Sequence, residues 1–284
     1  MAVKIKWEKS SETDCCKQKG TFNDYLIAKN MSANTICVYS YAVQQFFQFH
    51  KELTVSTLQL YKVFLLEHYK PQTVNLRIRA LNCYLEYLNY NESKLTMIKI
   101  QQKMYLDRII SQADYEYMKR RLLEDDELSY YFVIRYMAAT GVRISELIKF
   151  TVEDVQIGYK DLYSKGNKMR RIYIPTALCE KTREWLLSEN RYRGSLFLNR
   201  FGGPITASGI RSQLKIFAVR YNIDPEVVYP HSFRHRFAKN FIEKCGDIAF
   251  LSNLLGHESI ETTRIYLRRS SSEQYRIVNK VVDW

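Results

Sequence analysis

The chain of 284 residues is strongly basic, with 43 Lys and Arg against 30 Asp and Glu. Its hydrophobic share of 46% can form one large core or two modest ones, which excludes an intrinsically disordered chain. No apolar run is long enough to cross a membrane, and no apolar leader follows Met1. We therefore expect a cytoplasmic protein without a membrane partner.

The positive charge is spread along the chain rather than gathered in a tail. Residues 1–100 carry 13 basic and 8 acidic side chains, a net of +5, and the remaining residues contribute +8 to the total of +13. Both halves therefore suit a polyanionic partner such as DNA. The six cysteines show no zinc-binding spacing, which indicates reduced thiols and no metal site.

The first part of the chain predicts a small all-α domain. Residues 1–19 show no period and are expected to form an N-terminal extension. Residues 20–90 contain four amphipathic helical patterns, around 22–26, 36–47, 58–65 and 74–88. Ser32, Thr54 or Ser56, and Thr73 stand where N-caps are expected. Helices joined by such short turns form a compact bundle.

The fourth of these patterns carries polar residues away from its apolar stripe. Asn75, Arg77, Arg79 and Asn82 are of the types that hold phosphates or contact base edges, so we expect them to bind DNA. A solvated helix face explains them equally well. The following residues 91–104 are polar with little periodicity, and we expect the interdomain linker there.

Residues 105–284 predict a second, mainly α-helical domain. Ser111 opens one helix, and a nearly apolar run over 130–139 predicts a buried helix that ends at Gly141. Short strands are expected at 156–157, 162–163 and 171–174, with a hairpin turn at Gly166-Asn167 that places Lys165 near its tip. Helices are expected over 176–188, 206–221, 232–244, 247–255, 259–267 and 271–281.

Six side chains in this region could together cleave a phosphodiester: Arg143, Lys165, His231, Arg234, His257 and Tyr266. Such an enzyme must neutralise the nonbridging oxygens, activate a nucleophile and protonate the leaving alkoxide. The arginine fork matches two phosphate oxygens, and a phenol ionises more readily than an aliphatic alcohol. Each residue alone fits a surface charge or a helix cap, but three of the five histidines fall within 231–257.

These residues stand in three blocks whose order and spacing resemble the tyrosine recombinases of the phage-integrase and Xer group. The blocks are Ala139-Thr-Gly-Val-Arg143-Ile-Ser-Glu146-Leu, then Ser164-Lys165-Gly-Asn-Lys168-Met-Arg170, then His231-Ser-Phe-Arg234-His235 continuing to Leu255-Gly-His257 and Thr262-Thr-Arg-Ile-Tyr266. The resemblance implies a fold that is mainly α, with a four-helix core-binding domain and a catalytic domain that contains a small β-hairpin.

The resemblance also implies a mechanism. Arg143, Lys165, His231, Arg234 and His257 would surround the scissile phosphate. Tyr266 would attack it, leaving a 3′-phosphotyrosyl link and a free 5′-hydroxyl. That hydroxyl on a partner duplex would then attack the link, so that the reaction passes through a Holliday junction. The bond energy stays in the phosphotyrosine, so no metal, nucleotide or other cofactor is implied.

The residues around these six are given secondary roles by the same resemblance. Lys168 and Arg170 are expected to contact DNA. Glu146 is expected to orient its neighbours, and His235 to pack behind the catalytic groups.

The same resemblance implies the partners. We expect double-stranded DNA core sites with inverted repeats, bound by a dimer on one core site and by a tetramer in synapsis. Residues 268–284 would form a helix that docks on the neighbouring protomer, although folding back on its own core fits its apolar edge nearly as well.

Several biological roles stay open. About 20 residues precede the first helix, which favours a two-domain enzyme without an arm-site domain. A mobile-element enzyme, in particular a TnpI-type transposon resolvase, fits this length, as does Xer-type resolution of chromosome or plasmid dimers. A non-catalytic DNA-binding homologue and a type IB topoisomerase are disfavoured alternatives, because all six groups are present and the helical first domain is small.

Overall fold

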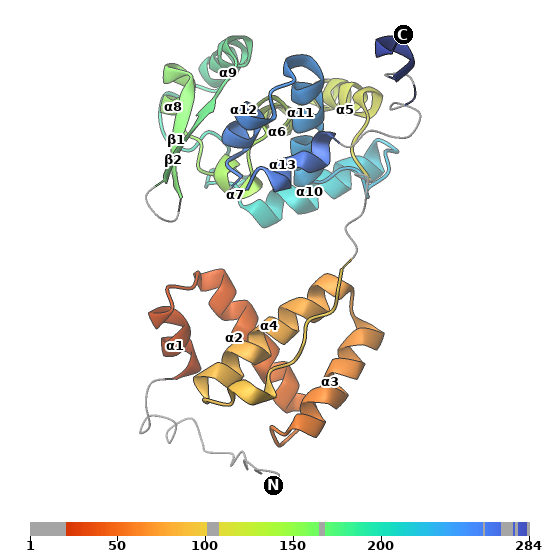
Figure 1. Ribbon diagram of the computed structural model, residues 1–284. Coiled ribbons are helices and arrows are strands. Elements are labelled where there is room, and N and C mark those ends of the chain that lie inside the picture. Colours follow the sequence, from red (N-terminus) through yellow and green to blue (C-terminus); the bar gives the residue numbers. More distant parts are fainter. Residues whose placement is uncertain are drawn as a thin grey trace. The chain divides into compact units, whose positions relative to one another are not determined.

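The computed structural model describes residues 21–100, 108–164, 168–257, 259–267, 275 and 278–282. The chain divides into two compact units, Met1–Gln102 (the N-unit) and Lys103–Trp284 (the C-unit), which Figure 1 colours from red to yellow and from yellow to blue. The described residues are mainly helical and contain one two-stranded sheet. This confirms the expected fold class.

The N-unit consists of the four expected helices. They are α1 (Phe22–Ala28), α2 (Ala33–Phe49), α3 (Val55–His68) and α4 (Pro71–Tyr87). The side chains of Ser32 and Thr54 accept from the backbone three residues on, which confirms them as N-caps. Thr73 is not a cap, because α4 already begins at Pro71, whose fixed φ suits the first helical position.

The apolar faces of these helices meet in one core. Phe46, Tyr61, Leu65, Ile78 and Leu81 are all completely buried in it. The core also includes Leu95, which lies beyond α4 and beyond the short 3₁₀ helix η1 (Asn91–Ser93). Part of the segment expected to be a linker therefore packs onto the N-unit.

Two asparagines of α4 hold that segment in place. The Asn82 amide donates to the carbonyl of Leu95 and accepts from its N–H, both at 2.8 Å. Asn75, which is buried, makes the same pair of bonds to Ile98 at 2.9 Å. Both amides thus have a structural role in holding the backbone of 95–98, and their expected contact with DNA stays a prediction.

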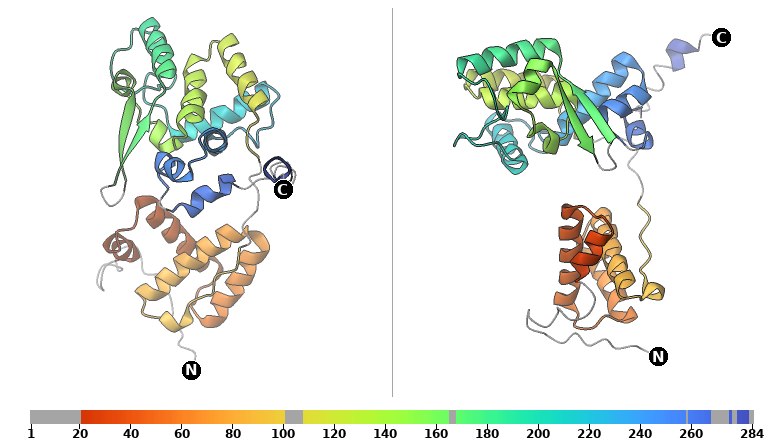
Figure 2. Two further views of the ribbon diagram at one scale, coloured as in Figure 1. Left: turned by 45° about the horizontal axis from the view of Figure 1, so that its top comes forward. Right: turned by 90° about the vertical axis from the view of Figure 1, so that its left-hand side faces the viewer.

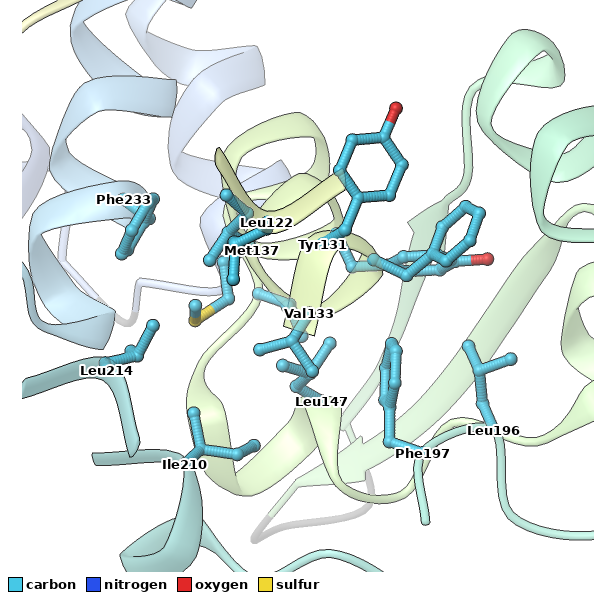
Figure 3. Packing of buried hydrophobic residues seen from close by; sticks show 14 of the residues in the cluster. Leu122, Tyr131, Val133, Met137, Leu147, Leu196, Phe197, Ile210, Leu214 and Phe233 are labelled. Atoms are coloured by element: carbon cyan, nitrogen blue, oxygen red, sulfur yellow. The ribbon is translucent and has the colours of Figure 1, made fainter. Parts of the chain in front are cut away.

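The C-unit is built around α6 (Leu128–Thr140), the buried helix expected to end at Gly141. Around it lie α5 (Gln112–Glu124), α9 (Thr176–Ser188), α10 (Ala207–Arg220) and α11 (Pro230–Cys245), and the short α7 (Ile144–Leu147) follows it directly. Figure 3 shows this core, with Met137 of α6, Leu214 of α10 and Phe233 of α11 on one side of it.

The strand expected at 156–157 is instead the end of α8 (Val152–Ile157). Thr151 and Asp154 form a capping box, and the left-handed Gly158 ends the helix. Val152 and Val155 are both buried, a spacing that turns one helix face to the core. The capping box and the helical spacing of the buried valines therefore outweigh the β-propensity of the two residues 156–157.

The expected hairpin is present. β1 (Tyr159–Ser164) pairs antiparallel with β2 (Lys168–Tyr173), from Tyr159 opposite Tyr173 to Ser164 opposite Lys168. Figure 1 and the left view of Figure 2 show the pair beside α8 at the edge of the C-unit. Lys165 lies outside the described residues, as does the side chain of Lys168.

The last described elements of the C-unit are α12 (Ile248–Leu255), α13 (Glu261–Arg264) and the 3₁₀ helix η2 (Ile265–Leu267). Most of the expected docking segment 268–284 lies outside the described residues, and its docking stays a prediction. In the described ranges, no helix has the length and apolar character needed to span a membrane.

Candidate active site

Helix α11 brings three polar side chains of the third block to one end of the C-unit. The helix begins at Pro230 and ends at the left-handed Gly246. Arg234 and His235 follow His231 by three and four residues, about one turn, so both lie on its side of the helix. The buried face of the helix includes Phe233 and Ala238, which are both completely buried. The packing of α11 therefore determines where this polar face points.

Arg234 is the centre of the site. Its side chain is buried, and its guanidinium donates to the carbonyls of Gly141 and Leu255, both at 2.6 Å. A third contact, 3.0 Å long, joins Arg234 Nη2 to His257 Nε2. Burial, followed by the nearby Arg143 and Arg170, lowers the Arg234 pKa to about 10, so the group stays charged at neutral pH.

Arg143 reaches the same place from the turn that follows α6. Gly141 adopts φ 61° and turns the chain, so that Arg143 becomes the N-cap of α7. Its guanidinium donates to Glu146 Oε1 at 3.1 Å and to the Gly256 carbonyl at 3.0 Å. About a third of its side chain, 36%, remains exposed. Arg143 is thus the accessible partner of the buried Arg234.

Arg170 belongs to this network rather than to an open DNA-binding surface. From β2 it donates to Glu146 Oε2 at 3.0 Å and to the Leu255 carbonyl, and its side chain is only 12% exposed. The expected contact of Arg170 with DNA stays a prediction. Its charge is held by Glu146, which also binds Arg143, as expected for an orienting carboxylate.

His257 has a defined tautomer. Its Nε2 faces Arg234, which can only donate, so Nε2 must accept and the proton must lie on Nδ1. Nδ1 lies 2.7 Å from Oγ1 of the completely buried Thr263, which can accept that proton. Burial and Arg234 lower the His257 pKa to about 4. His257 is thus neutral at physiological pH.

Tyr266 lies in η2, and its side chain is only 7% exposed. Its hydroxyl is 2.8 Å from Nδ1 of His235, and burial raises the Tyr266 pKa to about 12. The sequence interpretation had given His235 a packing role and missed this contact. The spacing of four residues between His231 and His235 was the available signal, because helical positions i and i+4 lie on one face.

His231 stands in the first turn of α11 and stays exposed. Its ring lies 6.2 Å from that of His235, between centroids. Desolvation of its inner side, followed by Arg234, lowers its pKa. A neutral, accessible imidazole at this position can donate a hydrogen bond to an incoming oxygen.

A groove of about 670 Å³ opens beside these residues within the C-unit. It is lined by α7, by both strands of the hairpin and by α12, and it reaches Arg143 and His257. Lys149 and Arg171 also line it, so its walls are basic. Within the described ranges, no three His, Cys, Asp or Glu side chains are grouped to hold a metal ion.

The phage integrase family matches residues 102–273, more than half of the chain. The chain belongs to this family. This integrase-family protein is therefore a tyrosine recombinase, an enzyme that cleaves and rejoins DNA through a tyrosine intermediate.

The curated relatives of this chain are also tyrosine recombinases, and they match it over about half or over most of its length. A tyrosine recombinase of Agathobacter rectalis is 26% identical across 92% of this chain and 94% of its own length. Tyrosine recombinase XerC of Listeria monocytogenes is 26% identical across 88% and 92%. Tyrosine recombinase XerD of Staphylococcus saprophyticus is 31% identical across 52% of each chain.

Solved structures share the fold. The Tn1549 transposon integrase in complex with transposon right end DNA has a TM-score of 0.72 at 16% identity, covering 92% of this chain and 98% of that one. The XerH site-specific recombinase bound to its difH substrate has a TM-score of 0.67 at 19% identity, covering 89% and 80%. At such identities the likeness extends to the fold alone.

Proposed function

We propose that this integrase-family protein is a site-specific recombinase in which Tyr266 is the nucleophile. Tyr266 attacks the scissile phosphate, forms a 3′-phosphotyrosyl link and releases a 5′-hydroxyl. Strands are then exchanged through a Holliday junction. The observation that carries the proposal is the hydrogen-bond network of Arg234, which contacts Gly141, Leu255 and His257. The next residue along the helix, His235, contacts the Tyr266 hydroxyl.

The two arginines of this network supply phosphate binding. Each guanidinium has five N–H donors, and the described contacts of Arg143 use two of them. Those of Arg234 use three. The remaining donors can hold the nonbridging oxygens, and the fixed carbonyl partners orient them in advance. His231 adds a hydrogen bond to the same phosphate, and His257 supports the site by accepting from Arg234.

Lys165 completes the proposed chemistry as the acid that protonates the departing 5′-oxygen. It follows Ser164, the last residue of β1, in a hairpin whose strands line the groove beside Arg143.

The DNA backbone is proposed to be held by three basic residues outside this chemistry. They are the exposed Arg79 and its neighbour Arg77 in the N-unit, and Lys168.

We propose duplex core sites with inverted repeats as substrates, bound by a dimer and synapsed as a tetramer in the cytoplasm. A similar fold, in lambda integrase, is solved as a dimer on a core site. The role that we favour is in a mobile element, as a resolvase or integrase. The Tn1549 transposon integrase is one protein with this fold. Xer-type dimer resolution is the second candidate, favoured by the XerC and XerD relatives.

A suicide-substrate assay tests the proposal. Nicked duplexes tiled across the DNA that flanks the gene are incubated with the protein, and covalent adducts at the 3′ phosphate are scored. We expect an adduct with the native protein and with Tyr117→Phe, which changes an exposed tyrosine of α5, but none with Tyr266→Phe. An adduct that survives in Tyr266→Phe contradicts the assignment of the nucleophile. Relaxation of supercoils without exchange between two sites would indicate a topoisomerase.

A further inference from the structure

We propose that His235 is the base that takes the phenolic proton of Tyr266 during strand cleavage and returns it during rejoining. The inference rests on the proposed function of Tyr266 as the nucleophile. It assigns to His235 a direct role on the reacting oxygen.

The geometry is that of a nucleophile and its base. Tyr266 Oη lies 2.8 Å from His235 Nδ1, within the range of a short hydrogen bond between residues 31 positions apart. The two rings are 5.6 Å apart at 51°, so the contact is made at the edges rather than by stacking. Tyr266 also belongs to one buried apolar cluster with Ile242, Leu251 and Leu255.

The direction of this hydrogen bond follows from burial. If Nδ1 carried the imidazole proton, it would donate to Oη, and the phenolic O–H would need another acceptor. Among the described residues, the Tyr266 hydroxyl has no hydrogen-bond partner except His235. A buried hydroxyl without an acceptor is costly, so the phenol donates and Nδ1 accepts. His235 is thus already placed to receive the proton.

The charges around the pair keep the base unprotonated. His235 is faced by His231 and Arg234, and burial together with these neighbours lowers its pKa to about 4. Tyr266 is faced by Arg234, Arg143 and Tyr229.

The two pKa values also set the timing of the transfer. Because the Tyr266 pKa is about 12, the proton stays on the phenol until the bond to phosphorus begins to form. The arriving phosphate raises the His235 pKa, because it brings negative charge.

The step balances as follows. The Tyr266 O–H bond breaks, its proton moves to His235 Nδ1, and the oxygen electron pair forms a bond to phosphorus. The bond from phosphorus to the 5′-oxygen breaks, and that oxygen takes a proton from the acid, proposed to be Lys165. In rejoining, the 5′-hydroxyl gives its proton back to Lys165 and attacks phosphorus, the bond from phosphorus to the Tyr266 oxygen breaks, and the His235 imidazolium protonates that departing oxygen.

His231 is less suited to this task. Among the described residues it makes no hydrogen bond to Tyr266, and its ring lies one helical turn from His235 at 6.2 Å between centroids. Its exposed position instead suits a nonbridging oxygen of the phosphate.

Single-turnover adduct formation on the nicked duplex that the native protein cleaves tests the inference. His235→Asn keeps a hydrogen-bond acceptor but removes the basic nitrogen. We expect it to bind the duplex normally and to form adduct about 10²- to 10⁴-fold more slowly. Glu243→Gln, on an exposed position of the same helix, should keep the native rate.

A more acidic phenol separates a base from a structural support. Fluorotyrosine incorporated at position 266 should restore much of the rate in His235→Asn, because it needs less help to lose its proton. A slow variant that fluorotyrosine does not rescue overturns the inference, as does a native rate in His235→Asn. Absence of adduct with the native protein would instead overturn the proposed function itself.

A second measurement tests the inference even if His235→Asn fails to fold. Fluorotyrosine is placed at position 266 of the otherwise native protein, and the rate at neutral pH is compared with that of tyrosine. With His235 as base the rate should change less than about threefold, because the proton moves together with bond formation. A rise of tenfold or more, in proportion to the phenolate fraction, would show that no base acts and would overturn the inference.

Discussion

At the scale of single residues, the site is organised around a buried cation that has no carboxylate. Among the described ion pairs, Arg143 and Arg170 share Glu146, but Arg234 has only carbonyls and His257. A buried charge that is only hydrogen-bonded remains poorly compensated. The binding of an anion would relieve this imbalance, so the residue that costs stability in the free protein favours the phosphate in the complex.

The first prediction concerns the fork geometry of Arg234. Arg234→Lys keeps the charge but cannot reach two carbonyls and a phosphate together. We expect single-turnover cleavage to fall by about 10²- to 10³-fold, while binding of the duplex weakens much less. Gel-shift titration and adduct kinetics on the same nicked duplex measure the two effects. Equal losses in binding and cleavage would mean that Arg234 holds the ground state and the transition state alike.

The second prediction concerns acid stability. His235 and His257 have pKa values lowered from 6.5 to about 4, so the unfolded chain binds protons that the folded chain refuses between these values. Stability is therefore fully present above pH 6.5 and falls as the pH drops toward 4. We expect a loss of roughly 2 kcal/mol for each histidine between pH 7 and pH 5, so at most about 4 kcal/mol for the two.

Urea unfolding at both pH values measures this loss. The double variant His235→Asn, His257→Asn should show a flatter dependence than the native protein. His68→Asn, on the surface of α3, serves as the control and should keep the native slope. An unchanged slope in the double variant would assign the acid loss to other groups.

At the scale of elements, the site depends on where helices stop. Gly141 ends α6 and turns the chain toward Arg143, and the left-handed Gly256 ends α12 next to His257. The carbonyls freed at these two helix ends accept from Arg234, Arg143 and Arg170. Helix C-termini carry partial negative charge, so they suit the arginines that bind there.

The third prediction tests one of these helix ends. A Cβ at Gly141 would overlap the ring of Phe237, and φ is 61°. Gly141→Ala should destabilise the C-unit by about 2–4 kcal/mol through strain and overpacking. Gly246→Ala is the matched control, since φ is 71° but no atom lies within 4 Å of its Cβ, and about 1 kcal/mol is expected. Chemical denaturation measures the free energy of unfolding of both variants. Equal losses would show that backbone strain alone, without the contact with Phe237, causes the loss of stability.

The fourth prediction separates support from DNA contact on α4. Asn82→Ala removes both partners of the Leu95 backbone and should destabilise the N-unit by about 1–3 kcal/mol. DNA binding of the folded protein should hardly change. Arg79→Ala, an exposed position on the same helix, should leave stability within about 0.5 kcal/mol and weaken DNA binding. Loss of binding in a stably folded Asn82→Ala would return this amide to the DNA surface.

At the scale of the whole molecule, each unit has its own apolar core. The buried residues of the N-unit form one cluster, and those of the C-unit form a large cluster around α6 and a smaller one that includes Tyr266. No described cluster contains residues of both units. Each unit is therefore stabilised by burial of its own apolar residues.

The fifth prediction follows from these separate cores. Ile78→Ala leaves a cavity in the N-unit and should lower its stability by about 2–5 kcal/mol, with the C-unit unchanged. Trp185, buried in the C-unit, reports that unit by fluorescence, while calorimetry records both transitions. Met137→Ala, in the C-unit core, should show the reverse pattern. A single transition that shifts equally in both variants would contradict independent cores.

The local structure and the family were readable from the sequence. Helix periods, the N-caps Ser32 and Thr54, and the hairpin depend on neighbours a few residues away, and the structure confirms them. The order of the motif blocks likewise identified a recombinase. Where short-range signals competed, as at 156–157, the capping of α8 prevailed over strand propensity.

Only the tertiary structure decided what each polar side chain contacts. It assigned Asn75 and Asn82 to the backbone of 95–98, Arg170 to Glu146, and His235 to Tyr266. The physical reason is distance along the chain. Arg234 and Gly141 are 93 residues apart and meet only because α11 packs on α6, through apolar faces that carry no information about the polar groups at their ends.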